Sequence, residues 1–301
     1  MKAKLTALVA GQLRKFPWFV DLLNRTAHAV SPETVALLDF PVFSRQRWTE
    51  ASPHEDLYRI IDANRDSYRS DLQFFRTLSG YFTAIAERET AGQQLIDPCW
   101  INGWMPALDG VVLYGYLVKY RPKIYLEVGS GNSTKFARRA IVDHKLDTKI
   151  VSIDPCPRAE INEICDEVIR RPVEEIDLSI FDRLGANDIL YIDNSHRSLM
   201  NSDVTALFID VLPRLAPGVV VEIHDVTLPF DYPAEWSKRY YSEQYLLAAY
   251  LLAKGNLFDI VLPNKFVSHD DELKEVLASL WQQDELKNVE RHGCSFWIRM
   301  K

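Results

Sequence analysis

The segment that most constrains the fold is a short apolar run that leads straight into a glycine-rich turn. Residues 124–128 suit a buried strand, and residues 135–142 suit a helix. Between them, Gly129 and Gly131 lack a Cβ and tolerate positive φ, so the backbone there can approach a ligand closely. Residues 132–134, Asn-Ser-Thr, suit a helix start whose free N–H groups would face a carboxylate or phosphate. The segment predicts strand, tight turn and helix, with an ordinary structural connection as the alternative.

The same alternation of apolar strands and helical segments continues to the end of the chain. Further strands are expected at 149–153, 168–169, 188–192, 219–223, 257–262 and 295–299. The longest helix is expected over 234–254, and another over 203–212. Nearly continuous apolar strands separated by helices predict an α/β fold with a doubly wound, mainly parallel sheet. The last two strands could pair antiparallel at one edge.

Residues 1–95 lack this alternation and read as helical throughout. We therefore expect a helical N-terminal cap over 1–95 and the sheet domain over 96–301. Between the two, Trp100 and Trp104 occur in a Pro- and Gly-rich loop. They either line a pocket or anchor the loop to the core.

Composition excludes several classes of partner. The chain of 301 residues has a formal net charge of −7 and no Lys/Arg-rich run, so nucleic acid is not expected. The apolar stretch at the N-terminus is too short for a signal peptide or a membrane span, so we expect a cytoplasmic protein with no membrane partner. The four cysteines form no C-x-x-C, which supports neither a zinc knuckle nor a disulfide framework.

Polar residues follow the apolar strands at the edge where a doubly wound sheet binds its ligand. Asp154, at the tip of the second strand, suits two hydrogen bonds from ribose hydroxyls, although it could instead cap a helix before Pro155. A dinucleotide turn would need a third glycine where Thr134 stands. An acid, Glu127, precedes the first glycine, where it can meet the charged methionyl end of S-adenosylmethionine. S-adenosylmethionine is therefore favoured over NAD.

The chain resembles the class I S-adenosylmethionine-dependent methyltransferases, which have a Rossmann-like sheet of seven strands with the last one reversed. The resemblance spans about residues 98–299 and rests on the motifs at 126–134, 152–155, 191–196 and 218–225, with 228–229 and 231–233. The last motifs look like a bacterial subgroup associated with O-methylation of small molecules or saccharides. The resemblance to the methyltransferases implies a cofactor site made of Glu127, Gly129, Ser130, Gly131, Asp154, Pro172, Val173 and Asp193.

Within that resemblance, Glu127 and the turn would hold the methionyl part, Asp154 the ribose, and Pro172 and Val173 the adenine. Asp193 would meet the methionine end or a metal.

For transfer to a hydroxyl, the candidate bases are His224 and His196, because an imidazole titrates near neutral pH. Asp225 would orient a histidine or bind a cation, and each histidine could instead be purely structural. Some O-methyltransferases of this fold hold Mg²⁺ between carboxylates after strands four and five, which here are Asp193 and Asp225, with Glu222 as a further ligand. Histidine is a poor Mg²⁺ ligand, which leaves metal dependence open.

The expected function is methyl transfer to a hydroxyl of a small molecule or saccharide. The alternatives are an NAD-dependent oxidoreductase and a nucleoside-binding or oligomer-forming module without turnover. The identity of the acceptor, homo-oligomer formation and the role of residues 1–95 stay open.

Overall fold

The chain folds into two compact units, residues 1–45 and 46–301. The structure is a computed structural model that describes residues 16–30, 42, 44–89, 97–157 and 159–301. In the first unit it describes helix α2 (Pro17–Val30), which carries no buried residue. Residues 1–15, 31–41, 43 and 90–95 of the expected cap lie outside the described residues.

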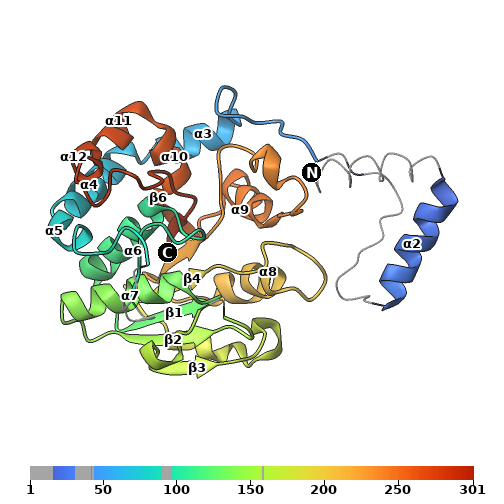
Figure 1. Cartoon of the computed structure of the whole chain (residues 1–301), viewed down its shortest axis with the longest axis horizontal. Coiled ribbons are helices and arrows are strands. Elements are labelled where there is room, and N and C mark those ends of the chain that lie inside the picture. Colours follow the sequence, from blue (N-terminus) through green and yellow to red (C-terminus); the bar gives the residue numbers. More distant parts are fainter. Residues whose placement is uncertain (1–15, 31–41, 43, 90–96, 158) are drawn as a thin grey trace. The chain divides into compact units, whose positions relative to one another are not determined.

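The second unit is built on a sheet of seven strands (Figure 1). The strands are β1 (Ile124–Val128), β2 (Lys149–Ile153), β3 (Glu167–Ile169), β4 (Ile189–Ile192), β5 (Val220–Ile223), β6 (Phe258–Pro263) and β7 (Phe296–Met300). Their order across the sheet is β3-β2-β1-β4-β5-β7-β6. β7 is antiparallel to both of its neighbours, whereas the other pairs are parallel. This confirms the expected α/β fold with a reversed last strand.

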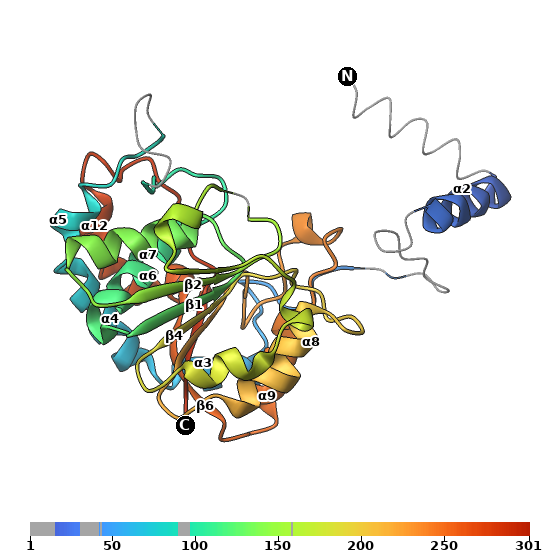
Figure 2. The ribbon, with the colours of Figure 1, turned by 90° about the horizontal axis from the view of Figure 1, so that it is seen from below.

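Helices cover both faces of this sheet, as Figure 2 shows. On one side lie α4 (Arg65–Arg76), α6 (Ala107–Tyr120) and α7 (Asn132–Asp143), and on the other α8 (Asp203–Thr205) and α9 (Glu243–Leu252). The other helices are α3 (Glu55–Asp62), α5 (Ser79–Phe82), α10 (Asn264–His269), α11 (Asp271–Glu275) and α12 (Ala278–Trp281). Short 3₁₀ turns occupy Asn162–Ile164, Val173–Glu175, Leu178–Arg183, Leu212–Arg214 and Ala234–Trp236. None of the described helices is long and apolar enough to cross a membrane.

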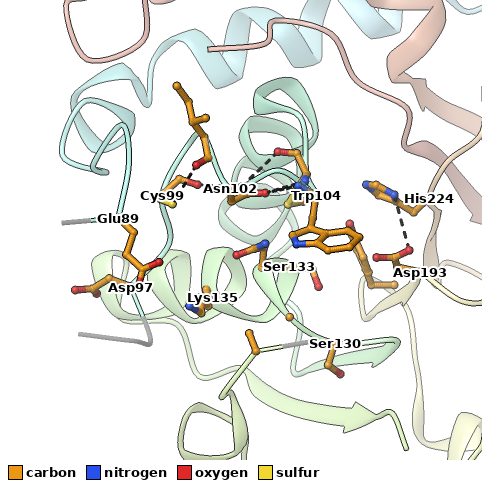
Figure 3. Close-up of a pocket in the computed structure, with 16 residues that line it drawn as sticks. Glu89, Asp97, Cys99, Asn102, Trp104, Ser130, Ser133, Lys135, Asp193 and His224 are labelled. Atoms are coloured by element: carbon orange, nitrogen blue, oxygen red, sulfur yellow. Dashed lines mark hydrogen bonds and ion pairs between the residues drawn. The ribbon is translucent and has the colours of Figure 1, made fainter. Parts of the chain in front are cut away.

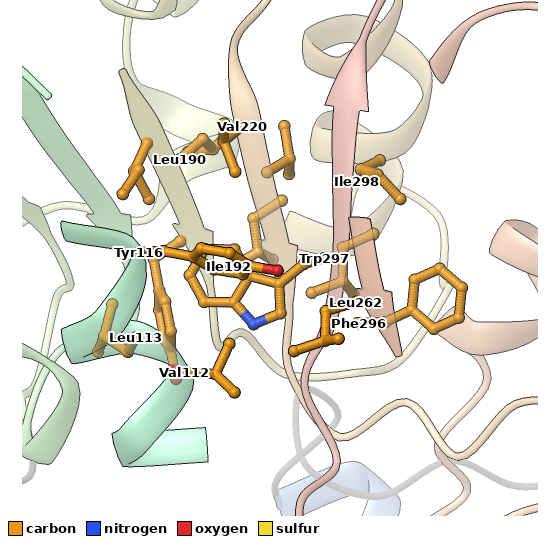
Figure 4. Close-up of a cluster of buried hydrophobic side chains, with 14 of the residues drawn as sticks. Val112, Leu113, Tyr116, Leu190, Ile192, Val220, Leu262, Phe296, Trp297 and Ile298 are labelled. Carbon is orange, nitrogen blue, oxygen red and sulfur yellow. The ribbon is translucent and has the colours of Figure 1, made fainter. Parts of the chain in front are cut away.

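The core lies between α6 and the middle of the sheet. Figure 4 shows Trp297 of β7 beside Tyr116 of α6, and their ring centroids are 4.8 Å apart in an edge-on arrangement. Both side chains are fully buried. Aromatic pairs of this kind add about 0.5–1.5 kcal/mol to the free energy gained from burial alone. The reversed strand is thus packed firmly against α6, which fixes the strand ends that carry the polar residues.

The unit boundary lies at 45/46, whereas the sequence suggested 95/96. Residues 55–85 are helical as expected, but their apolar side chains join the core of the sheet domain, as Leu57, Tyr68 and Phe82 do. Polar contacts also bind this segment to later parts of the chain: Arg65 pairs with Asp270 at 2.8 and 2.5 Å. The stripe of apolar residues identified a buried face correctly, yet it could not show which core that face joins.

Two long helices of the sequence interpretation are interrupted. The expected helix 234–254 is a 3₁₀ turn followed by α9, and Tyr240 between them has a φ of +54°. The expected helix 203–212 is α8 followed by a π-type turn at Ala206–Val211. Both interruptions lie near the edge of the sheet that carries the candidate site.

Candidate active site

The turn after β1 is fixed by a backbone contact that only glycine permits. Gly129 has a φ of +85°, and a Cβ at this position would lie 1.8 Å from the carbonyl oxygen of Asp193. The Gly129 N–H donates to the carbonyl of Ile153 at 3.0 Å, and the Asp193 N–H donates to the carbonyl of Val128 at 2.8 Å. The turn therefore locks the ends of β1, β2 and β4 together.

Asp154 joins this turn to the tip of β2. One carboxylate oxygen accepts the Ser130 N–H at 2.8 Å, and the other accepts the Cys156 N–H at 2.7 Å. The Ser130 and Ser152 hydroxyls are 2.6 Å apart. Asp154 thus bonds to the turn and also caps the chain after β2, and each of its oxygens has a second lone pair for a ligand.

A cavity of about 390 Å³ lies over this turn. Its walls include six of the eight residues expected to hold a cofactor, namely Gly129, Ser130, Asp154, Pro172, Val173 and Asp193. The first five come from three strand ends that are far apart in sequence. The fold therefore gathers most of the predicted cofactor residues around one space.

Glu127 lies behind the turn, and it is not among the residues that line the cavities described here. Its carboxyl group is fully buried and accepts hydrogen bonds from the hydroxyls of Tyr125, Ser133 and Thr134. Burial raises its pKa to about 7, against the opposing effect of these hydroxyl donors. Thr134, which stands in the place of a third glycine, also accepts the Gly131 N–H at 3.1 Å. These two residues brace the start of α7 from inside.

A second cavity of about 280 Å³ opens on the other side of the turn (Figure 3). Ser130, Gly131, Ser133 and Lys135 line it from the turn and the start of α7, and Trp104, Asp193 and His224 line it as well. The two tryptophans of the loop differ. Trp100 is buried and donates its indole N–H to the carbonyl of Phe82, whereas Trp104 is 63% exposed at the cavity. One tryptophan anchors the loop and the other lines the space.

A third and larger cavity, of about 900 Å³, adjoins the histidines. His196, His224 and Asp225 line it together with Trp236, Arg239, Tyr241 and Lys265. The Arg239 guanidinium lies over the Trp236 ring, 4.4 Å from its centroid. Asp193 lines all three cavities. The predicted cofactor side and the histidine side therefore meet at this one residue.

His196 and His224 lie among carboxylates. His196 Nε2 is 3.2 Å from Asp193 Oδ1 and 3.5 Å from Asp225 Oδ2, and its Nδ1 pairs with Glu243. His224 Nδ1 is 3.5 Å from Asp225 Oδ1 and 4.0 Å from Asp193 Oδ1. Both rings are nearly inaccessible, with exposed fractions of 3% and 4%. The structure thus brings all three predicted catalytic residues together.

The surrounding carboxylates hold both imidazoles in the charged form. Burial lowers the pKa of His196, but the charge of Glu243 and the hydrogen bond that His196 donates to Asp193 outweigh it and raise that pKa well above its usual value. Burial is likewise outweighed at His224, where Asp193 and Asp225 raise the pKa. Burial opposes ionisation of Asp225, yet the His224 contact lowers its pKa below the usual range. Both rings therefore keep their second proton to a higher pH than an ordinary imidazole does.

The two carboxylates expected to share Mg²⁺, Asp193 and Asp225, both line the 900 Å³ cavity. Each of them is in contact with both histidines. Glu222 is fully buried, and burial raises its pKa well above the usual value. Its two carboxyl oxygens have no hydrogen-bond partner among the described residues. A protonated, enclosed carboxyl is a poor ligand for Mg²⁺.

Three residues of this region were missed by sequence reasoning: Asp109, Glu243 and Cys294. Asp109 and Glu243 are fully buried acids on helices that are otherwise apolar, and that contrast was the available signal. Cys294 lies just before β7 and donates its thiol to Asp225 over 3.2 Å. Nothing near Cys294 in the sequence distinguishes it, because its partners come from residues about 70 and 185 positions away.

Known proteins resemble the part of the chain that carries this site. Residues 126–226 match the family model described as "Methyltransferase domain". An uncharacterized protein of Archaeoglobus fulgidus is 31% identical over 96 residues, which are 29% of this chain and 42% of that protein. The chain thus matches about two fifths of that relative's length.

Among solved structures, the plantazolicin methyltransferase BpumL in complex with SAH aligns over 82% of this chain and 90% of its own. The identity is 13% and the TM-score is 0.35, so we carry nothing over from it. The matched family model covers β1 to the end of β5, including the glycine turn, Asp154 and both histidines. Residues 126–226, about a third of the chain, are thus similar to a methyltransferase domain.

Proposed function

We propose that this chain transfers the methyl group of S-adenosylmethionine to a hydroxyl of a small molecule or saccharide. The observation that carries the proposal is the position of Asp193, which lines the cavity over the glycine turn as well as the two cavities beside the histidines. A donor held over the turn and an acceptor held by the aromatic cavity would meet at this residue. In-line displacement at a sulfonium needs mainly such positioning and the exclusion of water.

The donor side has the features that an adenosyl ligand needs. Asp154 Oδ1 and Oδ2 retain lone pairs for two ribose hydroxyls, while Pro172 and Val173 offer an apolar edge for the adenine. The N–H groups at the start of α7 are available to the carboxylate of the methionyl part. Glu127 acts indirectly in this proposal: it positions Ser133 and Thr134 at the helix start.

The acceptor side suits a hydroxylated ligand with flat apolar faces. Trp104, Trp236 and Tyr241 supply aromatic surfaces in the 900 Å³ cavity, and Arg239 and Lys265 supply hydrogen-bond donors. Sugar rings combine apolar faces with hydroxyl edges, and they need both kinds of contact. This composition supports a saccharide or a similar polyol as the acceptor.

The proton of the hydroxyl leaves through one of the histidines in this proposal, with Asp225 as the group that orients it. Because both rings are held as imidazolium ions, the base form is present only after one ring has lost a proton. Activity should therefore rise with pH through a midpoint well above 6.5. No step requires an ion between Asp193 and Asp225.

The cofactor assignment is tested by calorimetry with S-adenosylhomocysteine and, separately, with NAD. We expect binding of the first and none of the second, since Thr134 occupies the position of the third glycine of a dinucleotide turn. Binding of NAD with no response to S-adenosylhomocysteine would favour the oxidoreductase.

The catalytic assignment is tested with His224→Ala and Asp225→Asn in a methyl-transfer assay on a panel of saccharides and other hydroxylated metabolites. Each change should slow turnover at least about tenfold, as expected for loss of a general base or its orienting group. Asp225→Asn should also move the pH midpoint downward, because it removes a charge that raises the histidine pKa. His144→Ala, at the end of α7 and outside the three cavities, is the matched control. Unchanged rates in both site variants would remove the proposed base.

A module without turnover is the second candidate. It would bind S-adenosylhomocysteine, yet neither site variant would change any measured rate because no acceptor would be methylated. The buried pairing of both histidines is the observation that favours it.

A further inference from the structure

Three metal-binding residue types meet in the interior beside the histidine cavity. Asp109 comes from α6, His224 from the end of β5 and Cys294 from the segment before β7. Asp109 Oδ2, His224 Nε2 and Cys294 Sγ offer one ligand atom each, and the group lies within 4.8 Å of one another. We propose that these three residues hold a divalent transition-metal ion of the Zn²⁺ type.

Two of the three distances between the ligand atoms fit a tetrahedral ion, and the third lies within 4.8 Å. Bonds of about 2.0–2.3 Å to oxygen, nitrogen and sulfur place neighbouring ligand atoms of a tetrahedron roughly 3.3–3.8 Å apart. Asp109 Oδ2 is 3.5 Å from Cys294 Sγ and 3.6 Å from His224 Nε2. Two edges of the tetrahedron are therefore already in place without any movement of the backbone.

The chain also holds the Asp109 carboxylate in a fixed orientation. Its Oδ1 accepts hydrogen bonds from the Asn264 amide at 2.7 Å and the Ser295 N–H at 3.0 Å, and the Cys294 N–H is shared between Oδ1 at 3.0 Å and Oδ2 at 2.9 Å. Such outer contacts orient a ligand and are typical of metal sites. Oδ2 faces the thiol and the imidazole, which is the direction an ion would need.

Charge and access favour a cation at this place. Five carboxyl groups surround the two histidines, namely Asp109, Asp193, Glu222, Asp225 and Glu243, and the described residues supply no Lys or Arg partner to any of them. His224, Asp225 and Cys294 line the 900 Å³ cavity, so an ion has a route from solvent. Asp225 Oδ1, 3.2 Å from the thiol, stands close enough to become a fourth ligand or to hold a bound water.

The proposed site differs from a magnesium pair on Asp193 and Asp225. A thiolate and an imidazole are soft or intermediate donors that select Zn²⁺, Co²⁺ or related ions over Mg²⁺. The ion would replace the proton on His224 Nε2 and leave Nδ1 to donate to Asp225, 3.5 Å away, so that His196 is then the base of the proposed function. The inference rests on this geometry and stands whether or not methyl transfer is the activity.

The test is cobalt binding to the full chain after removal of metal with a chelator. Cobalt bound by a thiolate gives a near-ultraviolet charge-transfer absorption that carboxylate and imidazole ligands do not give. We expect this absorption at one Co²⁺ per chain in the wild type and in Cys165→Ser, a matched change of a half-buried free cysteine elsewhere. Cys294→Ser should lose the absorption and bind Co²⁺ at least about tenfold more weakly.

A second readout covers a Cys294 variant that fails to fold. Zn²⁺ should raise the melting temperature of the wild type, and His224→Gln should lose most of that increase, since an ion that binds the folded state stabilises it. Absence of the absorption in the wild type would overturn the proposal. Retention of the absorption in Cys294→Ser would overturn it too. The same holds if Asp193→Asn abolishes Co²⁺ binding while Cys294→Ser leaves that binding unchanged.

Discussion

The glycine turn and the histidine cluster lie side by side, yet they are built in opposite ways. The turn uses backbone groups and residues close in sequence: Gly129, Ser130 and the hydroxyls of 133–134. The histidine cluster joins side chains from five separate segments, with His196 and His224 paired to acids that lie up to about 115 residues away. The first region is held together mainly by backbone N–H groups and hydroxyls, whereas the second concentrates charged side chains in the interior.

This difference determines which substitutions should damage each region. A backbone cradle fails when a side chain occupies its space, and its defects should appear in ligand binding. A buried charge cluster fails when one partner is lost, because the remaining charge has neither water nor a counterion. The following experiments separate the two kinds of failure.

The largest expected effect is loss of the Glu243 carboxylate. Glu243 is fully buried and pairs with His196 Nδ1. Breaking a buried pair by removing one partner costs about 3–5 kcal/mol, so Glu243→Ala should lower the free energy of unfolding by that order. Urea denaturation measures it, with Glu275→Ala, an exposed glutamate on α11, as the control. A loss below about 1 kcal/mol would mean that the cluster is not held together by charge pairing.

Gly129→Ala should act mainly on ligand binding. A methyl group 1.8 Å from the Asp193 carbonyl oxygen must push β1 and β4 apart at the turn. We expect affinity for S-adenosylhomocysteine to fall at least about hundredfold, or roughly 2.7 kcal/mol. Calorimetry measures this, with circular dichroism to verify folding. Gly80→Ala, where a Cβ would meet nothing within 4 Å, should bind normally. If Gly129→Ala binds S-adenosylhomocysteine within about threefold of the wild-type affinity, the backbone of the turn can shift to accommodate a methyl group.

The smallest effect is a pH dependence from Glu127. Burial raises its pKa in the folded state to about 7, whereas the unfolded value is 4.5. Between these values the unfolded chain releases a proton that the folded chain keeps, so the free energy of unfolding falls as pH rises. Glu127→Gln should remove this slope. The difference in free energy of unfolding between the variant and the wild type should therefore change by about 1 kcal/mol or more across that pH window. Denaturation at several pH values measures it, with exposed Glu285→Gln as the control. If the free energies of unfolding of wild type and Glu127→Gln depend on pH in the same way, the pKa of Glu127 is not raised in the folded state.

The sequence predicted the turn well because its information is local. Glycines, cap residues and an apolar strand occur within twelve positions, and strand alternation then places Asp154 and Asp193 at the same edge of the sheet. The seven strands and the reversed β7 followed from the same alternation together with the family resemblance. The role of Glu127 stays a prediction, and the sequence did not indicate that its side chain is fully buried.

Sequence reasoning failed where contacts join distant segments. Asp109 and Cys294 approach His224 only after α6 and the β7 segment have packed together, and no spacing rule links positions 109, 224 and 294. The broken helix before Glu243 has the same origin. Its apolar stripe favours a continuous helix, but the chain interrupts that helix at Tyr240, just before Glu243 meets His196.

The contact between Gly129 and Asp193 has a consequence for how this protein can vary. The atom that excludes a side chain at position 129 is the carbonyl oxygen of residue 193, which every amino acid carries. No substitution at 193 can therefore make room for alanine at 129. The requirement for glycine at 129 does not depend on which side chain stands at 193. A saturation library of both positions should recover folded clones with glycine alone at 129, whichever residue stands at 193.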